Sequence, residues 1–199
     1  MIVFTIRVTK SDPSDPTVAL ERLVRMAKAN NMAPLDFDPN DYQFYCDVCD
    51  THVLPNTKHC QRCNRCSYEF DHHCVWVSND IGLHNYIDFV RMLGFVGCVG
   101  LLQFGLCIYT LVHIKGLEGD FQMGLMHKKS LKALMWITFV CCVIICILDA
   151  YLLTYHIYLI YNNLTTYKHI RKQQKRRKSK IIREVGKQSP DRGKDNRDS

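Results

Sequence analysis

Clustered cysteines and histidines are the residues of this sequence best suited to chemistry, because both side chains bind metal ions. Six of the eleven cysteines lie between Cys46 and Cys74, at short and regular intervals. The pattern C-x2-C-x9-H-x6-C falls on Cys46, Cys49, His59 and Cys66, and a shift of fourteen residues places it on Cys60, Cys63, His73 and Asp80. A structural zinc ion takes four such ligands in a tetrahedron. The spacing predicts two interleaved structural zinc sites.

The second site departs from the first because Asp80 stands in the position of the last cysteine. A carboxylate has the formal charge of a thiolate, but its oxygen is a harder ligand and binds zinc at about 2.0–2.2 Å, against about 2.3 Å for sulfur. We therefore expect a weaker site. The alternative is that Asp80 is not a ligand and that His52, His84 or a water molecule completes the shell.

One cysteine of the cluster, Cys74, is left over when the eight ligands have been assigned. It directly follows Asp71, His72 and His73, and only His73 is assigned to zinc. A free thiol beside a free imidazole, with a carboxylate to orient that imidazole, is the grouping of an activated nucleophile. Cys74, His72 and Asp71 are the predicted catalytic residues. The alternative is a surplus cysteine in a purely structural zinc module.

Two apolar blocks follow the cluster and must position it. Met92–Ile114 contains no Asp, Glu, Lys or Arg, and its length of about 23 residues would reach roughly 34 Å as a helix, enough to cross a bilayer. The chain is too short to surround two such helices as a soluble core. We predict membrane-spanning helices at 91–114 and 133–161, joined by a non-cytosolic loop at 115–132.

The charge distribution predicts the orientation of these spans. The net charge of +7 is concentrated after the second block, in "YKHIRKQQKRRKSKIIREVGK". Basic residues beside a span mark its cytosolic end, so we expect a cytosolic tail at 162–199, disordered at its end. The cysteine cluster then also lies in the cytosol, where thiols stay reduced. We interpret the basic tail as attracted to anionic lipid rather than to nucleic acid.

The N-terminal segment 1–45 is predicted to contain a short helix followed by an extended linker. Asp15 is suited to be the N-cap of this helix and Pro16 its first residue. Its apolar residues repeat at helical spacing, which fits either a helix lying on the membrane or a helix packed on the zinc module. "MIVFTIRV" is too short for the core of a signal peptide and lacks a basic leader.

Several stretches together resemble one protein family. "CDVC", "KHCQRCNRC" and "DHHC" follow one another up to Cys74, and Trp76 and Asn85 come next, before the first span. This arrangement resembles the DHHC family of protein S-acyltransferases, also called palmitoyltransferases. Thr165 and Thr166, after the second span, are similar to the Thr-Thr motif of that family.

The resemblance implies a two-step acyl transfer. Cys74, deprotonated with help from His72, would attack the thioester of a long-chain acyl-coenzyme A and then pass the chain to a cysteine of a target protein. Asp71 would orient His72, Thr165 and Thr166 would lie near Asp71, and Trp76 would sit at the membrane interface. The eight zinc positions derived above coincide with the family's ligands, with Asp80 in place of a cysteine.

Two further departures from the family pattern bear on this expectation. Lys168 stands where the Thr-Thr motif normally has glutamate. Family members usually have four spans, of which this chain shows the last two, and "MIVFTIRV" is interpreted as the last turns of a missing second span.

The sequence as a whole predicts an α-helical integral membrane protein with a small cytosolic Cys/His-rich two-zinc domain, 46–90, preceding the transmembrane helices. Its predicted function is protein S-palmitoyltransferase, with two structural zinc ions, acyl-coenzyme A as co-substrate and cysteine-containing proteins as acceptors. We expect a multi-pass protein of the Golgi, the endoplasmic reticulum or another endomembrane, without a nucleic-acid partner. The alternative is a weakly active or inactive zinc-bound membrane adaptor or accessory subunit.

Overall fold

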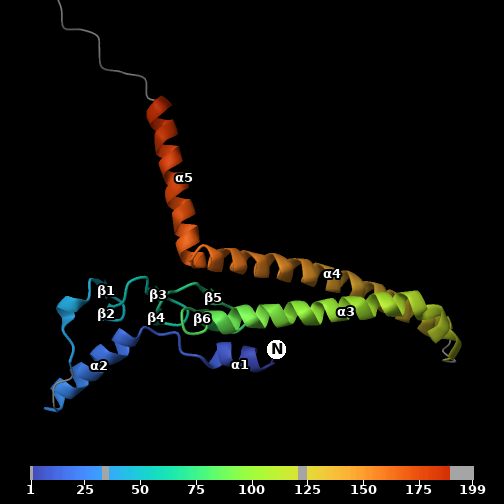
Figure 1. The fold of residues 1–199 in the computed structure, drawn as a ribbon, viewed down its shortest axis with the longest axis horizontal. Helices are drawn as coiled ribbons and strands as arrows, with labels where there is room; N and C mark the ends of the chain where they lie inside the picture. Colours follow the sequence, from blue (N-terminus) through green and yellow to red (C-terminus); the bar gives the residue numbers. More distant parts are fainter. Residues whose placement is uncertain (1, 33–35, 121–124, 189–199) are drawn as a thin grey trace, which may run out of the picture.

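Two long helices lying side by side form the axis of the molecule (Figure 1). The computed structural model describes residues 2–32, 36–120 and 125–188. The axis consists of α3 (Tyr86–Asp120) and α4 (Leu125–Tyr161), which run in opposite directions. The strands gather at the end of this pair where α3 begins and α4 ends, and α5 (Thr166–Gln188) turns off crosswise from the same end.

Both long helices are long and apolar enough to cross a membrane, over Tyr86–His113 and Lys132–Tyr161. Only 6% of the most apolar stretch of each helix is buried, which is unlike a core helix of a soluble domain. The predicted connection at 115–132 corresponds to the stretch between the two candidate spans, and helix extends into it from both sides, because α3 continues to Asp120 and α4 starts at Leu125. The segment contains no proline to stop a helix.

Within the predicted tail, 162–199, the helix α5 covers 23 residues, Thr166–Gln188. A run of lysine, arginine and glutamine has high helix propensity, which explains a helix in so polar a sequence. The predicted disorder at the end of the tail concerns 189–199, which lie outside the described residues.

Three short antiparallel hairpins make up the Cys/His-rich region, which we call the hairpin module (44–81). Their strands are β1 (Phe44–Cys46) with β2 (Thr51–Val53), β3 (Lys58–Cys60) with β4 (Arg65–Ser67), and β5 (His72–Cys74) with β6 (Asn79–Ile81). Each pair is related to the next by fourteen residues, and the register is the same in all three: Cys46 faces Thr51, Cys60 faces Arg65 and Cys74 faces Asn79.

The turns repeat as faithfully as the strands. Asp50, Asn64 and Ser78, again fourteen residues apart, all have positive φ, at 52°, 49° and 49°. Asp and Asn tolerate this left-handed conformation better than most residues. The repeat recognised in the sequence as two interleaved ligand sets is therefore a threefold backbone repeat, and Cys74 belongs to its third copy.

An apolar cluster joins the third hairpin to the helices. It consists of Val8, Cys74, Val77, Ile81, Phe89, Met92 and Leu93. Val8 comes from α1 (Ile2–Lys10), which packs along α3. Cys74 is thus held between two helices, with 5% of its surface exposed.

The helix α2 (Pro16–Ala29) packs on the hairpin module rather than lying apart from it, and η1 (Pro39–Asp41) precedes β1. Asp15 is the N-cap of α2 and Pro16 is the first residue of α2, which confirms the prediction from the sequence. Asp15 is fully buried, and one of its carboxylate oxygens accepts a hydrogen bond from the backbone N–H of Thr17 at 2.9 Å. The other oxygen accepts from the backbone N–H of Leu54 at 2.8 Å and from the hydroxyl of Thr57. One side chain therefore caps α2 and fixes the loop between the first two hairpins.

Replacing Asp15 tests this double role. Asp15→Ala removes the cap and leaves two buried donors without a partner, so we expect a loss of about 3 kcal/mol, or a melting temperature lower by roughly 6–12 °C. A thiol-reactive dye that reports exposure of the buried Cys66 measures the transition in detergent. Asp12→Ala, at an exposed turn three residues earlier, is the control and should shift the melting temperature by less than a third as much. Equal shifts would contradict the role of Asp15.

Candidate active site

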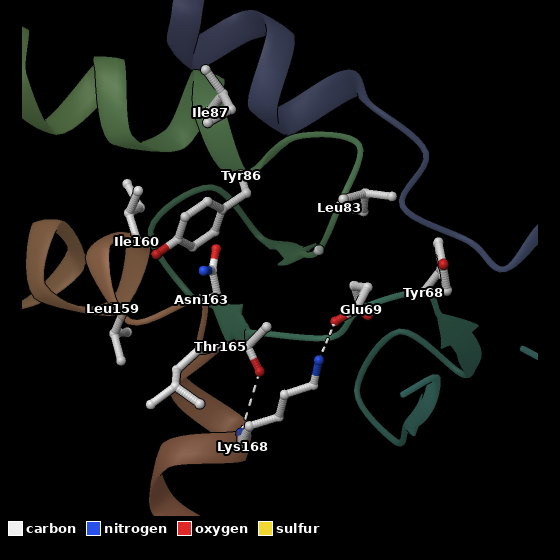
Figure 2. A pocket seen from close by; sticks show the side chains of 12 residues that line it. Tyr68, Glu69, Leu83, Tyr86, Ile87, Leu159, Ile160, Asn163, Thr165 and Lys168 are labelled. Atoms are coloured by element: carbon white, nitrogen blue, oxygen red, sulfur yellow. Dashed lines mark hydrogen bonds and ion pairs between the residues drawn. The ribbon is translucent and has the colours of Figure 1, made fainter. Parts of the chain in front are cut away.

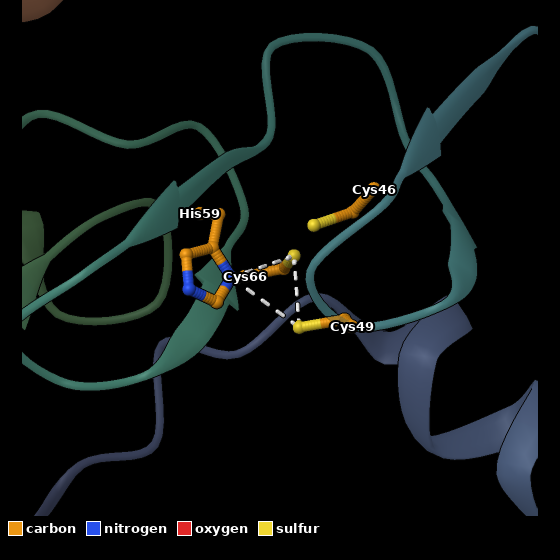
Figure 3. A group of neighbouring side chains, drawn as sticks. All are labelled: Cys46, Cys49, His59 and Cys66. Atoms are coloured by element: carbon orange, nitrogen blue, oxygen red, sulfur yellow. Dashed lines mark hydrogen bonds between the residues drawn. The ribbon is translucent and has the colours of Figure 1, made fainter.

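The first predicted ligand set lies together in the hairpin module. The ligand atoms of Cys46, Cys49, His59 and Cys66 are all within 4.8 Å of one another (Figure 3). His59 Nδ1 lies 3.3 Å from Cys49 Sγ and 3.8 Å from Cys66 Sγ. Ligand atoms of a tetrahedral zinc are separated by roughly 3.4–3.8 Å, given the usual bond lengths. The donors and their spacing fit a zinc ion.

The second set, Cys60, Cys63, His73 and Asp80, has the same arrangement one repeat further along. His73 Nδ1 lies 3.3 Å from Cys63 Sγ and 2.8 Å from Asp80 Oδ1. Asp80 is fully buried, and its other oxygen accepts a hydrogen bond from Ser67 Oγ at 2.8 Å. Such a bond to the second oxygen orients a ligating carboxylate. The residues present fit zinc here too.

His52, an alternative fourth ligand, lies elsewhere. Its backbone N–H donates to Glu21 Oε2 at 2.6 Å and its Nδ1 lies 3.2 Å from the same oxygen. Among the described residues, Asp80 is the residue that groups with Cys60, Cys63 and His73, and neither His52 nor His84 is part of either group.

The three residues predicted to be catalytic lie at the start of the third hairpin. His72 Nδ1 lies 2.8 Å from Asp71 Oδ2. Burial opposes the charged imidazole, but hydrogen bonds to Asp71 and Cys74 outweigh it and raise the pKa of His72 to about 9. Burial also opposes ionisation of Cys74, but hydrogen bonds from His72 and from the backbone N–H groups of Val77 and Trp76 lower the pKa of the thiol. A thiolate and an imidazolium stabilise each other at this point.

The threefold repeat explains why Cys74 lies outside both ligand groups. Cys46 and Cys60, its counterparts in the first two hairpins, each have a second cysteine three residues later. In the third hairpin this position is Val77, which is buried in the apolar cluster. Cys74 keeps the backbone setting of a ligand cysteine without the partner that would complete a site.

Asp71 is connected to the C-terminal helix as well as to His72. Only 2% of Asp71 is exposed, and its Oδ1 accepts the backbone N–H of Thr166, the first residue of α5, at 2.6 Å. The first N–H groups of a helix have no partner within the helix and favour an anion. Thr165 Oγ1 accepts from Lys168 N–H at 3.2 Å, as a helix cap does. The Thr-Thr pair thus acts through a helix N-terminus.

Lys168, the charge reversal noted in the sequence, has an opposite charge beside it. Its Nζ lies 2.6 Å from Glu69 Oε2, two residues before Asp71 (Figure 2). A glutamate at position 168 would complete a capping box with Thr165; lysine cannot, and instead ties α5 to the hairpin module. The pair borders an open pocket of about 410 Å³ whose apolar side includes Leu83, Tyr86 and Leu159.

His156 is a further residue beside the predicted catalytic group, from a distant part of the chain. It comes from α4, is 2% exposed, and accepts or donates a hydrogen bond at 3.0 Å to the hydroxyl of Tyr86 on α3. Its ring centroid lies 6.0 Å from that of His72 and 5.1 Å from that of Phe89. An ionisable residue within an apolar helix is the signal that could have identified it.

The two remaining predicted residues take different places. Asn85 is 1% exposed; its Oδ1 accepts from Gly82 N–H and its Nδ2 donates to the Asp80 carbonyl, both at 2.9 Å. It therefore ties the second ligand site to the start of α3. Trp76, by contrast, is 92% exposed in the turn that follows Cys74.

The sequence of this chain is similar to those of known proteins. The family model for "DHHC palmitoyltransferase" matches residues 39–173. Protein S-acyltransferase 8 of Arabidopsis thaliana is 38% identical over 133 residues, which is 64% of this chain and 30% of that protein. Palmitoyltransferase ZDHHC5 of Rattus norvegicus is 42% identical over 77 residues, or 38% of this chain and 11% of that protein. The chain spans about a third, or less, of the length of the curated relatives it matches.

A charge swap tests the link between Lys168 and Glu69. Glu69→Lys places two like charges together and should speed amide hydrogen exchange in the first turn of α5 by roughly three- to tenfold. The double variant Glu69→Lys/Lys168→Glu should restore slow exchange, since it re-forms the pair with reversed signs and completes the cap at Thr165.

The matched control is Glu184→Lys, which changes the charge of the protein by the same amount near the other end of α5. It should leave exchange in the first turn unchanged. If the double variant exchanged as fast as Glu69→Lys, the ion pair would not be what holds α5 in place.

Proposed function

This chain belongs to the DHHC palmitoyltransferase family, and from that premise we propose that Cys74 carries a long-chain acyl group from acyl-coenzyme A to cysteine residues of target proteins. The observation that carries the proposal is the setting of Cys74: a thiol outside both ligand groups, beside an imidazole that is itself held by a buried carboxylate. The names of the relatives, protein S-acyltransferase and palmitoyltransferase, support the same class of reaction.

In the first half-reaction, the Cys74 thiolate attacks the carbonyl carbon of the acyl-coenzyme A thioester. A new S–C bond forms at Cys74, the bond to the coenzyme A sulfur breaks, and the coenzyme A thiolate leaves with the proton of the His72 imidazolium. Asp71 keeps His72 oriented through Nδ1, so that Nε2 is the atom free to exchange the proton.

In the second half-reaction, the neutral His72 accepts the proton of an acceptor cysteine. The resulting thiolate attacks the acyl group on Cys74, the new thioester forms on the target protein, and Cys74 leaves as a thiolate. Both steps exchange one thioester for another, which explains why no oxidant or energy source is needed. The thiolate of Cys74 and the imidazolium of His72 are restored after each cycle.

The two ligand groups are proposed to hold structural zinc ions. Zinc would supply rigidity to the module, because hairpins of three-residue strands bury too little apolar surface to be stable alone. The ligands Cys60 and Cys63 lie in the second repeat and His73 and Asp80 in the third, so this metal would fix the hairpin that carries Cys74.

We further propose that α3 and α4 span an endomembrane, of the Golgi or endoplasmic reticulum for example, with the hairpin module and α5 on the cytosolic side. The concentration of basic residues in α5 supports this orientation. Exposed Trp76 would then lie at the interface, and Cys74 would meet both the water-soluble coenzyme A and an acyl chain that enters the bilayer.

Acyl labelling tests the proposed carrier. The protein incubated with an alkynyl palmitoyl-coenzyme A should acquire a hydroxylamine-sensitive label, which Cys74→Ser abolishes. His72→Gln should slow labelling by roughly 10²–10⁴-fold, because the proton acceptor is lost. Cys98→Ser, at an exposed cysteine of α3, is the control and should label normally.

Zinc content should be measured on the same samples. A label that persists in Cys74→Ser would overturn the assignment of the carrier. A folded protein that retains zinc but never acquires label would support the adaptor function instead.

The proposed role of Asp80 predicts a gain of metal affinity on substitution. Asp80→Cys exchanges a carboxylate for the softer thiolate, so one of the two zinc ions should be released more slowly to a chelator, by roughly tenfold or more. Asp80→Ala should release that ion faster while the other stays bound. Release rates that do not respond to either change would argue that Asp80 is not a ligand.

A further inference from the structure

A row of basic side chains lies along one face of α5. It consists of Lys172, Arg176, Lys180 and Arg183, spaced at i, i+4, i+8 and i+11, and we call it the basic stripe. Lys175 and Ser179 flank it and line the same shallow hollow. At 3.6 residues per turn this spacing keeps the four side chains on a single face.

The direction of this face follows from the first turn of α5. His169 Nδ1 lies 2.9 Å from the Tyr155 hydroxyl, and its ring centroid is 5.9 Å from that of Tyr158. Both tyrosines belong to α4, so the His169 face of α5 is the face turned toward α4. Lys172, Arg176, Lys180 and Arg183 follow His169 at three, seven, eleven and fourteen residues, which places them on that same face.

The crosswise course of α5 determines which of its faces is turned to a membrane surface. Since α5 leaves the end of α4 across the direction of the long helices (Figure 1), a bilayer that contains α3 and α4 has its surface along α5. The basic stripe then faces the lipid headgroups, and the opposite face is turned to the cytosol. This step rests on the proposed membrane insertion of α3 and α4, not on the proposed acyl transfer.

No acidic side chain among the described residues is paired with the stripe. All four side chains are exposed, and none forms an ion pair within the part of the chain that the structure describes. Like charges spaced three and four residues apart destabilise a helix. An anionic surface that neutralises this face therefore stabilises the helix.

We propose that the basic stripe binds anionic phospholipid headgroups of the membrane that α3 and α4 span. Each basic residue near such a surface contributes about 1 kcal/mol. The stripe thereby fixes the direction of α5, whose first N–H is held by Asp71. Anionic lipid would steady the carboxylate that orients His72, and the lipid composition of the membrane would act on the active site through one helix.

Hydrogen exchange of the full chain in nanodiscs tests the proposal. Amides of α5 between 172 and 183 should exchange on the order of a thousandfold more slowly in discs with roughly a third phosphatidylserine than in discs of phosphatidylcholine alone, and high salt should remove the difference. Lys172→Gln/Arg176→Gln should lose roughly thirtyfold of that protection, at about 1 kcal/mol per charge.

The matched control is Arg177→Gln/Lys178→Gln, which removes the same charge from other faces of α5 and should retain the protection. Slow exchange across α3 and α4 in both discs reports membrane insertion separately. Equal exchange of α5 in the two discs, or equal losses in the two double variants, would overturn the proposal. So would protection in neutral discs by single-stranded RNA, an acidic peptide or coenzyme A that exceeds the effect of phosphatidylserine.

Discussion

The arrangement of the site depends on one buried carboxylate. Asp71 has two oxygens with two different partners: His72 on the hairpin module and the first N–H of α5, which follows the second long helix. A buried carboxylate without such partners would cost several kcal/mol. The protein can therefore satisfy Asp71 only when the module, α4 and α5 are assembled, and the orientation of His72 becomes a property of the whole fold.

The second constraint is the fourteen-residue repeat, which places two equivalent cysteines within ligand groups and the third outside them. Three copies of one hairpin place equivalent cysteines at Cys46, Cys60 and Cys74, and the first two fall within ligand groups. The third copy has Val77 where the others have a second cysteine, and this valine packs into the cluster between α1 and α3. In the proposed function, Cys74 is free to react because its copy of the hairpin lacks one ligand, while the backbone N–H groups that suit a thiolate are retained.

Spacing within the sequence predicted the two ligand groups, the N-cap at Asp15 and two apolar helices, because each is set by residues close together or by composition. The third copy of the hairpin was missed because its signature residue is absent: Val77 carries no metal-ligand signal, and the repeat is revealed by the matching strand register and by the positive φ at Ser78. Helix extends into the predicted connection between the spans from both sides, because polarity alone does not end a helix.

By itself, the sequence determined which side chains gather into the two candidate ligand groups and which cysteine of the cluster lies outside them, since close spacing brings such groups together in any compact fold. It also determined the family, through motifs that are local. The tertiary structure alone decided that Glu69 balances Lys168 and that the ring of His156 lies 6.0 Å from that of His72, centroid to centroid. It also shows how Thr166 meets Asp71 across 95 positions, a proximity that the family resemblance implied without its geometry. Contacts of this kind form because two long helices lead the chain away from the hairpin module and bring it back. No short-range pattern in the sequence encodes which residues then meet.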